Sequence, residues 1–176
     1  LEAVARAKRH GCNTMQIFSR SPRGGPAPKL PVGAAEQFDA QRRREGIDPL
    51  AVHSPYIINL ASPEAQMWKQ SLRLYQEEYE RASLLNAQYL VTHVGSHRGS
   101  GDAAGIARVA EALNRTLDAR RSTLMVLLEN TAGSRCQSYG SVAGIDAFVK
   151  NQAGRVETGR RRIRRSGWIE ACRIAG

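Results

Sequence analysis

Hydrophobic and polar positions alternate between strand-like and helical patterns from Leu1 to about Ala132. Four short apolar runs have the length and composition of strands in a sheet, and they are Met15–Phe18, Pro49–His53, Tyr89–His93 and Leu124–Glu129. The last run is rich in Leu and Val, which is typical of a strand buried on both faces. Amphipathic segments with helical periodicity lie between the runs, at Leu1–Arg9, Ala34–Glu45, 62–85 and from Asp102 onward.

The spacing of the four runs predicts how the strands connect. They end near residues 18, 53, 93 and 129, at intervals of 35, 40 and 36 residues. Such intervals are typical of successive βα units, in which a helix crosses over between parallel strands. A full TIM (β/α)₈ barrel needs about 250 residues, and this chain has 176. The predicted fold class is therefore α/β, a partial TIM (β/α)₈ barrel of about four βα units.

The regular pattern fades after Gly133. We expect residues 1–133 to form the partial-barrel domain and residues 134–176 to be an irregular basic tail. Residues 150–176 contain eight basic residues against two acidic ones, so this segment carries most of the net charge of +10. Such composition is typical both of nucleic-acid-binding tails and of disordered or frame-disrupted sequence, and we favour the second interpretation. The remaining 149 residues, at +4, are only mildly basic.

Apolar runs and cysteines indicate the compartment. The longest purely apolar run, Leu124–Leu128, is far too short to cross a bilayer, and the charged segment at the start of the chain does not resemble a secretory signal. The cysteines, Cys12, Cys136 and Cys172, are odd in number and far apart, unlike a disulfide scaffold. We expect a cytoplasmic monomer.

Three side chains that commonly ligate metals lie at the ends of three successive predicted strands. They are His53, His93 and Glu129. The carboxyl ends of parallel barrel strands converge on one face, and neighbouring strands are about 4.8 Å apart. Two imidazoles and a carboxylate suit Zn²⁺ with an open position for water. A single histidine at a strand end is more often a hydrogen-bonded loop residue, but three such residues in register favour a metal site.

Five segments of the chain carry a family resemblance. They are Gly11–Phe18, Ser21–Arg23, His53–Ala61, His93–His97 and Glu129–Gly133. In this order they resemble endonuclease IV, a family of metal-dependent apurinic/apyrimidinic endonucleases built on a TIM barrel. The resemblance extends over about residues 1–133, three quarters of the chain.

The resemblance implies a substrate, a reaction and cofactors. Members of the family bind three metal ions, usually Zn²⁺, with Mn²⁺ as the alternative. They hydrolyse the phosphodiester 5′ to an abasic site in double-stranded DNA and leave a 3′-hydroxyl, using a metal-activated hydroxide. His53, His93 and Glu129 match the ligands of one ion, and Glu129 also matches a catalytic carboxylate that bridges to a second ion.

The resemblance also assigns DNA-binding residues. Arg23, Tyr56 and Ile57 match loop residues that enter the minor groove and help to expel the abasic nucleotide. An aromatic and an apolar side chain can prop open a base step while an arginine meets the backbone. The alternative for Tyr56 and Ile57 is ordinary packing under a loop.

His97 is interpreted as a residue that orients a ligand, and Arg42–Arg44 as a solvated helix face.

The chain departs from the family in the remaining metal ligands, which should come from later strands. Trp168–Gly176 faintly resembles one such segment, but Arg173 stands where a histidine is needed, and arginine stays protonated. We therefore expect a partial or frame-disrupted sequence with at most one recognisable metal site and weak or no incision by this chain alone. The alternatives are a metal-dependent sugar isomerase or epimerase of the same barrel type, and a non-catalytic DNA-binding fragment.

Overall fold

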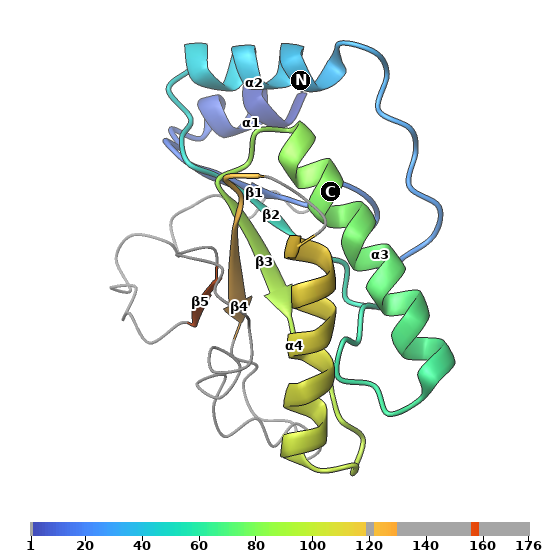
Figure 1. Ribbon diagram of the computed structural model, residues 1–176. Coiled ribbons are helices and arrows are strands. Elements are labelled where there is room, and N and C mark those ends of the chain that lie inside the picture. The colour runs from blue at the N-terminus through green and yellow to red at the C-terminus, as the bar shows by residue number, and fades with distance from the viewer. Residues whose placement is uncertain (1, 119–121, 130–155, 159–176) are drawn as a thin grey trace.

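The computed structural model describes residues 2–118, 122–129 and 156–158 (Figure 1). The helices are α1 (Glu2–Arg9), α2 (Ala34–Arg44), α3 (Ala65–Leu84) and α4 (Asp102–Asp118). The strands are β1 (Met15–Ile17), β2 (Leu50–His53), β3 (Tyr89–His93), β4 (Met125–Glu129) and β5 (Val156–Thr158). The predicted alternation of helices and strands up to β4 is confirmed, with element ends that differ by a few residues at most.

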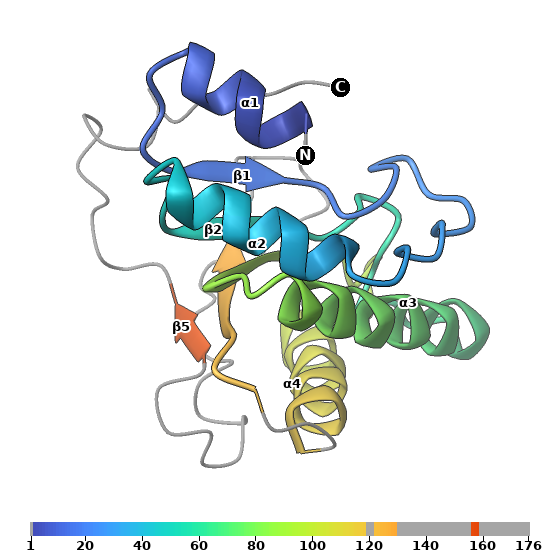
Figure 2. The same cartoon turned by 90° about the horizontal axis from the view of Figure 1, so that it is seen from above.

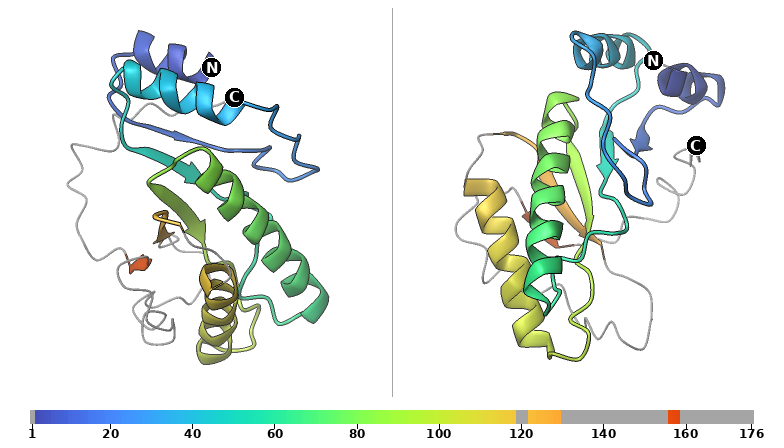
Figure 3. Two further views of the ribbon diagram at one scale, coloured as in Figure 1. Left: turned by 45° about the horizontal axis from the view of Figure 1, so that its top comes forward. Right: turned by 90° about the vertical axis from the view of Figure 1, so that its right-hand side faces the viewer.

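The strands form one parallel sheet in the order β1-β2-β3-β4-β5. Strands β1, β2, β3 and β4 pair in chain order, and a helix connects each of the first three to the next. Helices α3 and α4 lie side by side on the outside of the sheet (Figures 1 and 3), and α1 and α2 lie next to β1 and β2 (Figure 2). This is the topology of consecutive βα units in a TIM barrel, as predicted.

The two faces of β4 differ in burial. Val52, Leu90 and Val126 are opposite one another in the register, fully buried, and part of the core that the helices contribute to. On the other face, Met125 and Leu127 are only half-buried. The prediction that β4 is buried on both faces is therefore wrong, because among the described residues the helices pack against one face only.

The predicted irregular tail contains a fifth strand. Val156–Thr158 pairs in parallel with β4, so the prediction of irregular structure for residues 134–176 is wrong at these three residues (Figure 1). Backbone pairing imposes no side-chain pattern that three residues could reveal. The other predictions made for this tail, including the weak motif at Trp168–Gly176, lie outside the described residues. No helix in the described part of the chain is long and apolar enough to cross a membrane.

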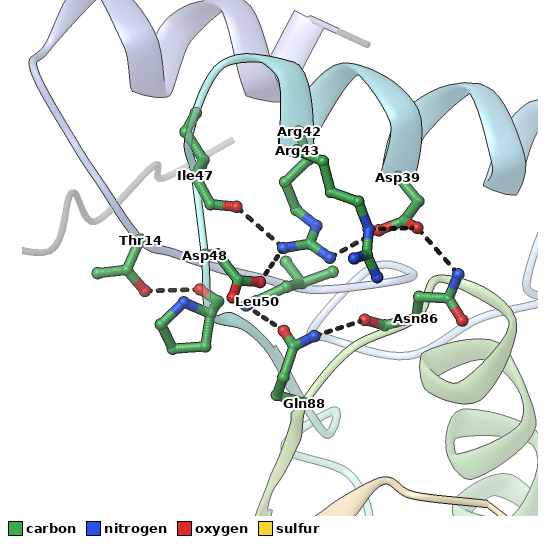
Figure 4. A network of polar contacts seen from close by, with 10 residues as sticks. Thr14, Asp39, Arg42, Arg43, Ile47, Asp48, Leu50, Asn86 and Gln88 are labelled. Carbon is green, nitrogen blue, oxygen red and sulfur yellow. Dashed lines mark hydrogen bonds and ion pairs between the residues drawn. The ribbon is translucent and has the colours of Figure 1, made fainter.

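The arginine run at the end of α2 is only partly solvated. Arg42 is fully buried, contrary to the prediction, whereas the other two arginines are mostly exposed. Arg42 donates to the Ile47 carbonyl oxygen at 2.9 Å and forms ion pairs with Asp39 at 2.6 Å and Asp48 at 2.5 Å (Figure 4). A buried guanidinium needs such partners to offset its desolvation. Three carbonyl or carboxylate oxygens supply them.

The same network joins α2 to the amino-terminal edge of the sheet. Asp39 also accepts a hydrogen bond from Asn86 Nδ2 at 3.0 Å, and Gln88 Oε1 accepts one from the Leu50 backbone N–H at 2.7 Å (Figure 4). These contacts lie at the ends of the strands opposite His53 and Glu129. Their function is therefore structural, and they leave the carboxyl-terminal edge free for chemistry.

Asp39 makes the acid stability of the fold dependent on this network. Burial raises the pKa of Asp39, but hydrogen bonds from Asn86, Arg42 and Arg43 outweigh it and hold the pKa below its ordinary value of 3.8. The ionised form therefore stabilises the folded state above about pH 3.8, and this stabilisation is lost as the pH falls through the lower pKa of the folded state. Asp39→Asn is expected to lower the urea midpoint at pH 7, and the difference from the wild type should shrink below pH 3.8. A constant difference across this range would contradict the assignment.

Candidate metal centre

Three side chains meet at the carboxyl-terminal edge of the sheet. His93 and Glu129 are direct partners in the β3–β4 register, and His53 is the last residue of β2. Glu129 Oε2 lies 3.1 Å from His53 Nε2 and 3.5 Å from His93 Nε2. One potential ligand atom from each residue lies within 4.8 Å of the others. The parallel register thus brings the three predicted ligands to one point.

The tautomer of His53 makes this point suitable for a cation. His53 Nδ1 lies 2.7 Å from the Ser54 carbonyl oxygen, which can only accept, so Nδ1 carries a proton. In the neutral ring, Nε2 then presents its lone pair to the Glu129 carboxylate. Two acceptors at 3.1 Å repel each other unless a proton or a metal ion lies between them. A hydrogen bond from the distal ring nitrogen to a carbonyl is a frequent feature of metal-ligating histidines.

The two contacts of Glu129 are close to the donor spacing of zinc, within a group of potential ligand atoms that lie within 4.8 Å of one another. Ligand atoms about 2.0–2.2 Å from a tetrahedral Zn²⁺ are about 3.3–3.5 Å apart, and the two contacts of Glu129 measure 3.1 and 3.5 Å. The His53 side chain is almost fully buried, whereas the Glu129 side chain is 44% exposed. The site is therefore rigid on the sheet side and accessible from solvent, as a catalytic rather than a purely structural site requires.

Electrostatics keep two of these groups ready to bind a cation. When a proton lies between His53 Nε2 and Glu129, the resulting hydrogen bond lowers the pKa of Glu129. This effect is larger than the opposing effect of burial, and the nearby histidines lower the pKa further. Burial lowers the pKa of His93, although the Glu129 carboxylate acts in the opposite direction. The carboxylate is therefore ionised and the His93 ring neutral over a wider pH range than in water, and these are the forms that ligate metals.

Two aromatic rings enclose the histidines. The Phe18 ring centroid lies 5.1 Å from that of His53, and the Tyr56 centroid lies 5.7 Å from His53 and 5.6 Å from His93. Phe18 and Tyr56 also contact each other, at 5.5 Å. Sequence reasoning did not select Phe18, although it ends the first apolar run at the same sheet edge as His53. The rings form an apolar wall that limits how the imidazoles can turn.

The residues assigned to DNA binding lie on two adjoining loops beside this centre. The Tyr56 backbone N–H donates to the Pro22 carbonyl oxygen at 3.0 Å, next to Arg23. A Cβ on Gly24, which has φ +98°, would lie 2.7 Å from Ile57 Cδ1, so the loops touch there. Tyr56 is 61% and Ile57 46% exposed, and Arg23 is exposed as well. Both side chains are therefore partly exposed, while Ile57 also packs against Gly24 and the Tyr56 ring against Phe18, so their role in DNA binding stays a prediction beside the packing alternative.

The loop that carries Arg23 is fastened to α3 by buried charges. Arg20 and Glu78 form an ion pair in which both side chains are almost fully buried. Glu78 also accepts a hydrogen bond from Ser19 Oγ at 2.8 Å, and Arg81 donates to the Ser19 carbonyl oxygen at 2.6 Å. These contacts bring the chain after β1 back against α3 and fix the base of the loop.

His97 serves the loop that precedes α4. Its Nδ1 accepts hydrogen bonds from the backbone N–H groups of Gly99 and Gly101, each at 3.2 Å, and its Nε2 lies 3.1 Å from Asp102 Oδ1. These contacts order the loop between β3 and α4. The suggested role of His97 in orienting a metal ligand stays a prediction.

Comparison of the chain with protein families agrees with this architecture. Residues 4–154 match the family described as xylose isomerase-like TIM barrel. The chain is 47% identical over 154 residues to a probable endonuclease 4 from Methanoculleus marisnigri, a match that covers 82% of this chain and 54% of that protein. The chain spans about half the length of the curated relatives it matches.

Solved structures share the fold. Endonuclease IV from Thermus thermophilus matches with a TM-score of 0.75 and 30% identity, covering 89% of this chain and 55% of that one. A D-tagatose 3-epimerase-like protein matches with a TM-score of 0.61 and 16% identity, covering 83% of this chain and 55% of that one, which shows the fold alone. The chain belongs to the xylose isomerase-like TIM barrel family, and within it the resemblance to endonuclease IV is confirmed.

Proposed function

We propose that this chain provides the cation-binding and DNA-probing part of a DNA-repair endonuclease that acts at abasic sites. The proposed reaction is hydrolysis of the phosphodiester 5′ to the abasic site, which leaves a 3′-hydroxyl. The observation that carries the proposal is the convergence of His53, His93 and Glu129 directly beside the exposed side chains of Tyr56 and Ile57. The same edge of the sheet thus carries both the potential metal ligands and the Tyr56–Ile57 pair, called the wedge below because it is proposed to insert between base pairs.

His53, His93 and Glu129 would hold one divalent cation, Zn²⁺ by the donor set, with Mn²⁺ as the alternative. A bound cation supplies positive charge for the attacked phosphate and activates water near neutral pH. Glu129 provides the negative charge of the ligand set, and its exposed fraction of 44% leaves it accessible to substrate. Phe18 and Tyr56 exclude water from one side of the imidazoles.

The two loops would engage DNA around the abasic nucleotide. Tyr56 and Ile57 can insert between base pairs where the missing base has already weakened stacking, which lowers the energy needed to open the step. Arg23, on the adjoining loop, can pair with a backbone phosphate. Because Pro22 and Gly24 contact the Tyr56–Ile57 segment directly, and the Tyr56 ring contacts His53 and His93, the two loops and the proposed ligands would face DNA as one surface.

Binding to a duplex with one tetrahydrofuran abasic analogue tests the proposal. With Zn²⁺ present, the full chain is expected to bind this duplex more tightly than an intact duplex. EDTA should reduce this preference, measured as the ratio of the two affinities. Tyr56→Ala is expected to reduce the preference about tenfold, as loss of an aromatic contact to bases does. Leu84→Ala is the control. It removes a similarly exposed side chain from the last residue of α3, whereas Tyr56 lies in the loop before the first residue of α3, and it should leave the preference unchanged.

Incision is a secondary readout. The described residues contain one group of three potential ligands, whereas the resemblance implies three ions, so EDTA-sensitive cleavage by this chain is expected to be weak or absent. Salt-dependent binding that is equal for intact and abasic duplexes would favour the non-catalytic DNA-binding alternative. Conversion of a ketose without abasic-site preference would favour the sugar epimerase alternative.

A further inference from the structure

The side chain of Asn59 ties the loop after β2 to the loop after β3. Its Oδ1 accepts hydrogen bonds from the backbone N–H groups of Ser96, at 2.9 Å, and Ala61, at 3.2 Å. Its Nδ2 donates to the Ser96 carbonyl oxygen at 3.0 Å. The side-chain amide therefore pairs with both backbone groups of Ser96, as a neighbouring strand would. The Asn59 backbone N–H in turn donates to Ser71 Oγ of α3 at 3.1 Å.

The close approach of Asn59 to the loop after β3 requires glycine at position 95. A Cβ on Gly95 would overlap Asn59 Oδ1 and lie 2.8 Å from Asn59 Cα, and the residue has φ +89°. Both the space and the backbone conformation therefore require glycine. The close approach brings the Ser96 backbone within reach of a short side chain, so the two loops have one defined relative position.

The pairing of Asn59 with Ser96, here called the clamp, lies close in the chain to the residues of the proposed function. The β2–β3 pairing continues one residue past His53, where the Ser54 N–H donates to the Val91 carbonyl oxygen at 2.9 Å. The exposed side chains of Tyr56 and Ile57 belong to the stretch between Ser54 and Asn59. His93, the last residue of β3, lies three residues before Ser96.

We propose that Asn59 is a positioning residue that holds His93 and the Tyr56–Ile57 segment in a fixed relation, so that the cation site and the DNA-facing edge are ordered together. The inference rests on the proposed function for its DNA part, whereas its metal part concerns the chain's own ligands. The Tyr56 ring already contacts both imidazoles. A shift of either loop therefore changes the ligand geometry and the wedge at once.

Asn59→Asp tests the clamp with little change in size. One carboxylate oxygen keeps the bonds from Ser96 and Ala61, whereas the other replaces the Nδ2 donor and faces the Ser96 carbonyl oxygen. Co²⁺ binding to the full chain, followed by visible absorbance, is expected to weaken about 10–100-fold, as when a residue that orients a metal ligand is lost. The preference for the abasic duplex should fall in the same variant.

Asn86→Asp is the matched control. It makes the same amide-to-carboxylate change in the network at the opposite edge of the sheet, where Asn86 donates to Asp39. It is expected to lower the thermal midpoint while leaving Co²⁺ affinity unchanged. If both variants weakened Co²⁺ binding equally, Asn59 would be a stability residue only and the proposal would fail. Wild-type Co²⁺ affinity in folded Asn59→Asp would overturn it as well.

Ser71→Ala provides a milder test in case Asn59→Asp does not fold. It removes the acceptor for the Asn59 N–H and leaves the side-chain bonds in place, so Co²⁺ affinity should fall about two- to fivefold, as for the loss of one hydrogen bond. Unchanged affinity would count against the clamp. Should wild-type protein bind Co²⁺ and these variants bind it less tightly, without any preference for abasic DNA, the positioning role would stand and the proposed function would fail.

Discussion

Glu129→Gln is expected to weaken Zn²⁺ binding by this chain more than about 100-fold, beyond the range for residues that only orient a ligand. Glu129 contacts both histidines and is the one anionic member of the group. Glutamine keeps the shape but loses the charge that offsets a divalent cation, and its amide nitrogen cannot ligate. The measurement is a competition titration against a chromophoric chelator.

Two further variants accompany this titration, one at a second potential ligand and one at a carboxylate outside the site. His53→Ala removes the most buried ligand of the three and should cause a comparable loss of affinity. Glu111→Gln makes the same change in an exposed carboxylate of α4, which pairs with Arg115 at 2.6 Å, and should bind Zn²⁺ like the wild type. Unchanged metal stoichiometry in both His53→Ala and Glu129→Gln would remove these residues as ligands and with them the basis of the proposed chemistry.

Glu78→Ala is expected to destabilise the fold by about 3–5 kcal/mol. The Glu78 side chain is fully buried and pairs with Arg20, whose side chain is 3% exposed. Removing the carboxylate leaves a buried guanidinium and the Ser19 hydroxyl without this acceptor. The loss should appear as a lower midpoint in urea denaturation followed by circular dichroism.

The neighbouring carboxylate is the control for this loss. Glu77 pairs with the same arginine at 3.1 Å, but its side chain is 43% exposed. Glu77→Ala is therefore expected to cost less than about 1 kcal/mol, as surface ion pairs do. Equal destabilisation by both changes would show that burial of Glu78 does not set its contribution.

The sequence predicts the sheet and the ligand cluster for a physical reason. Each candidate ligand ends an apolar run, and the spacing of the runs requires helical crossovers and hence parallel strands. Parallel strands place their ends on one edge, so the meeting of His53, His93 and Glu129 follows from order and spacing alone. The assignments of Arg23, Tyr56 and Ile57 came from family resemblance, and they remain predictions.

Other features depend on contacts that no local pattern reveals. Arg42 and its two neighbours are alike in sequence, and only the fold shows that Arg42 is the one that reaches Asp48 and the Ile47 carbonyl oxygen (Figure 4). The pairing of Asn59 with Ser96 joins residues 37 positions apart through irregular loops. Phe18 contributes to the centre through ring packing. Such long-range polar and aromatic contacts can be recognised only when the fold is known.

The position of Tyr56 has a consequence for spectroscopy. A ring current from this exposed phenol acts on both imidazoles, whose centroids are 5.6 and 5.7 Å away. The chain has four histidines, so their Cε1 protons give few and easily resolved NMR signals. If the proposed DNA binding tilts the phenol, two of these signals should shift together. DNA binding can thus be followed through the chemical shifts of the histidine Cε1 protons, without attaching a label to the protein.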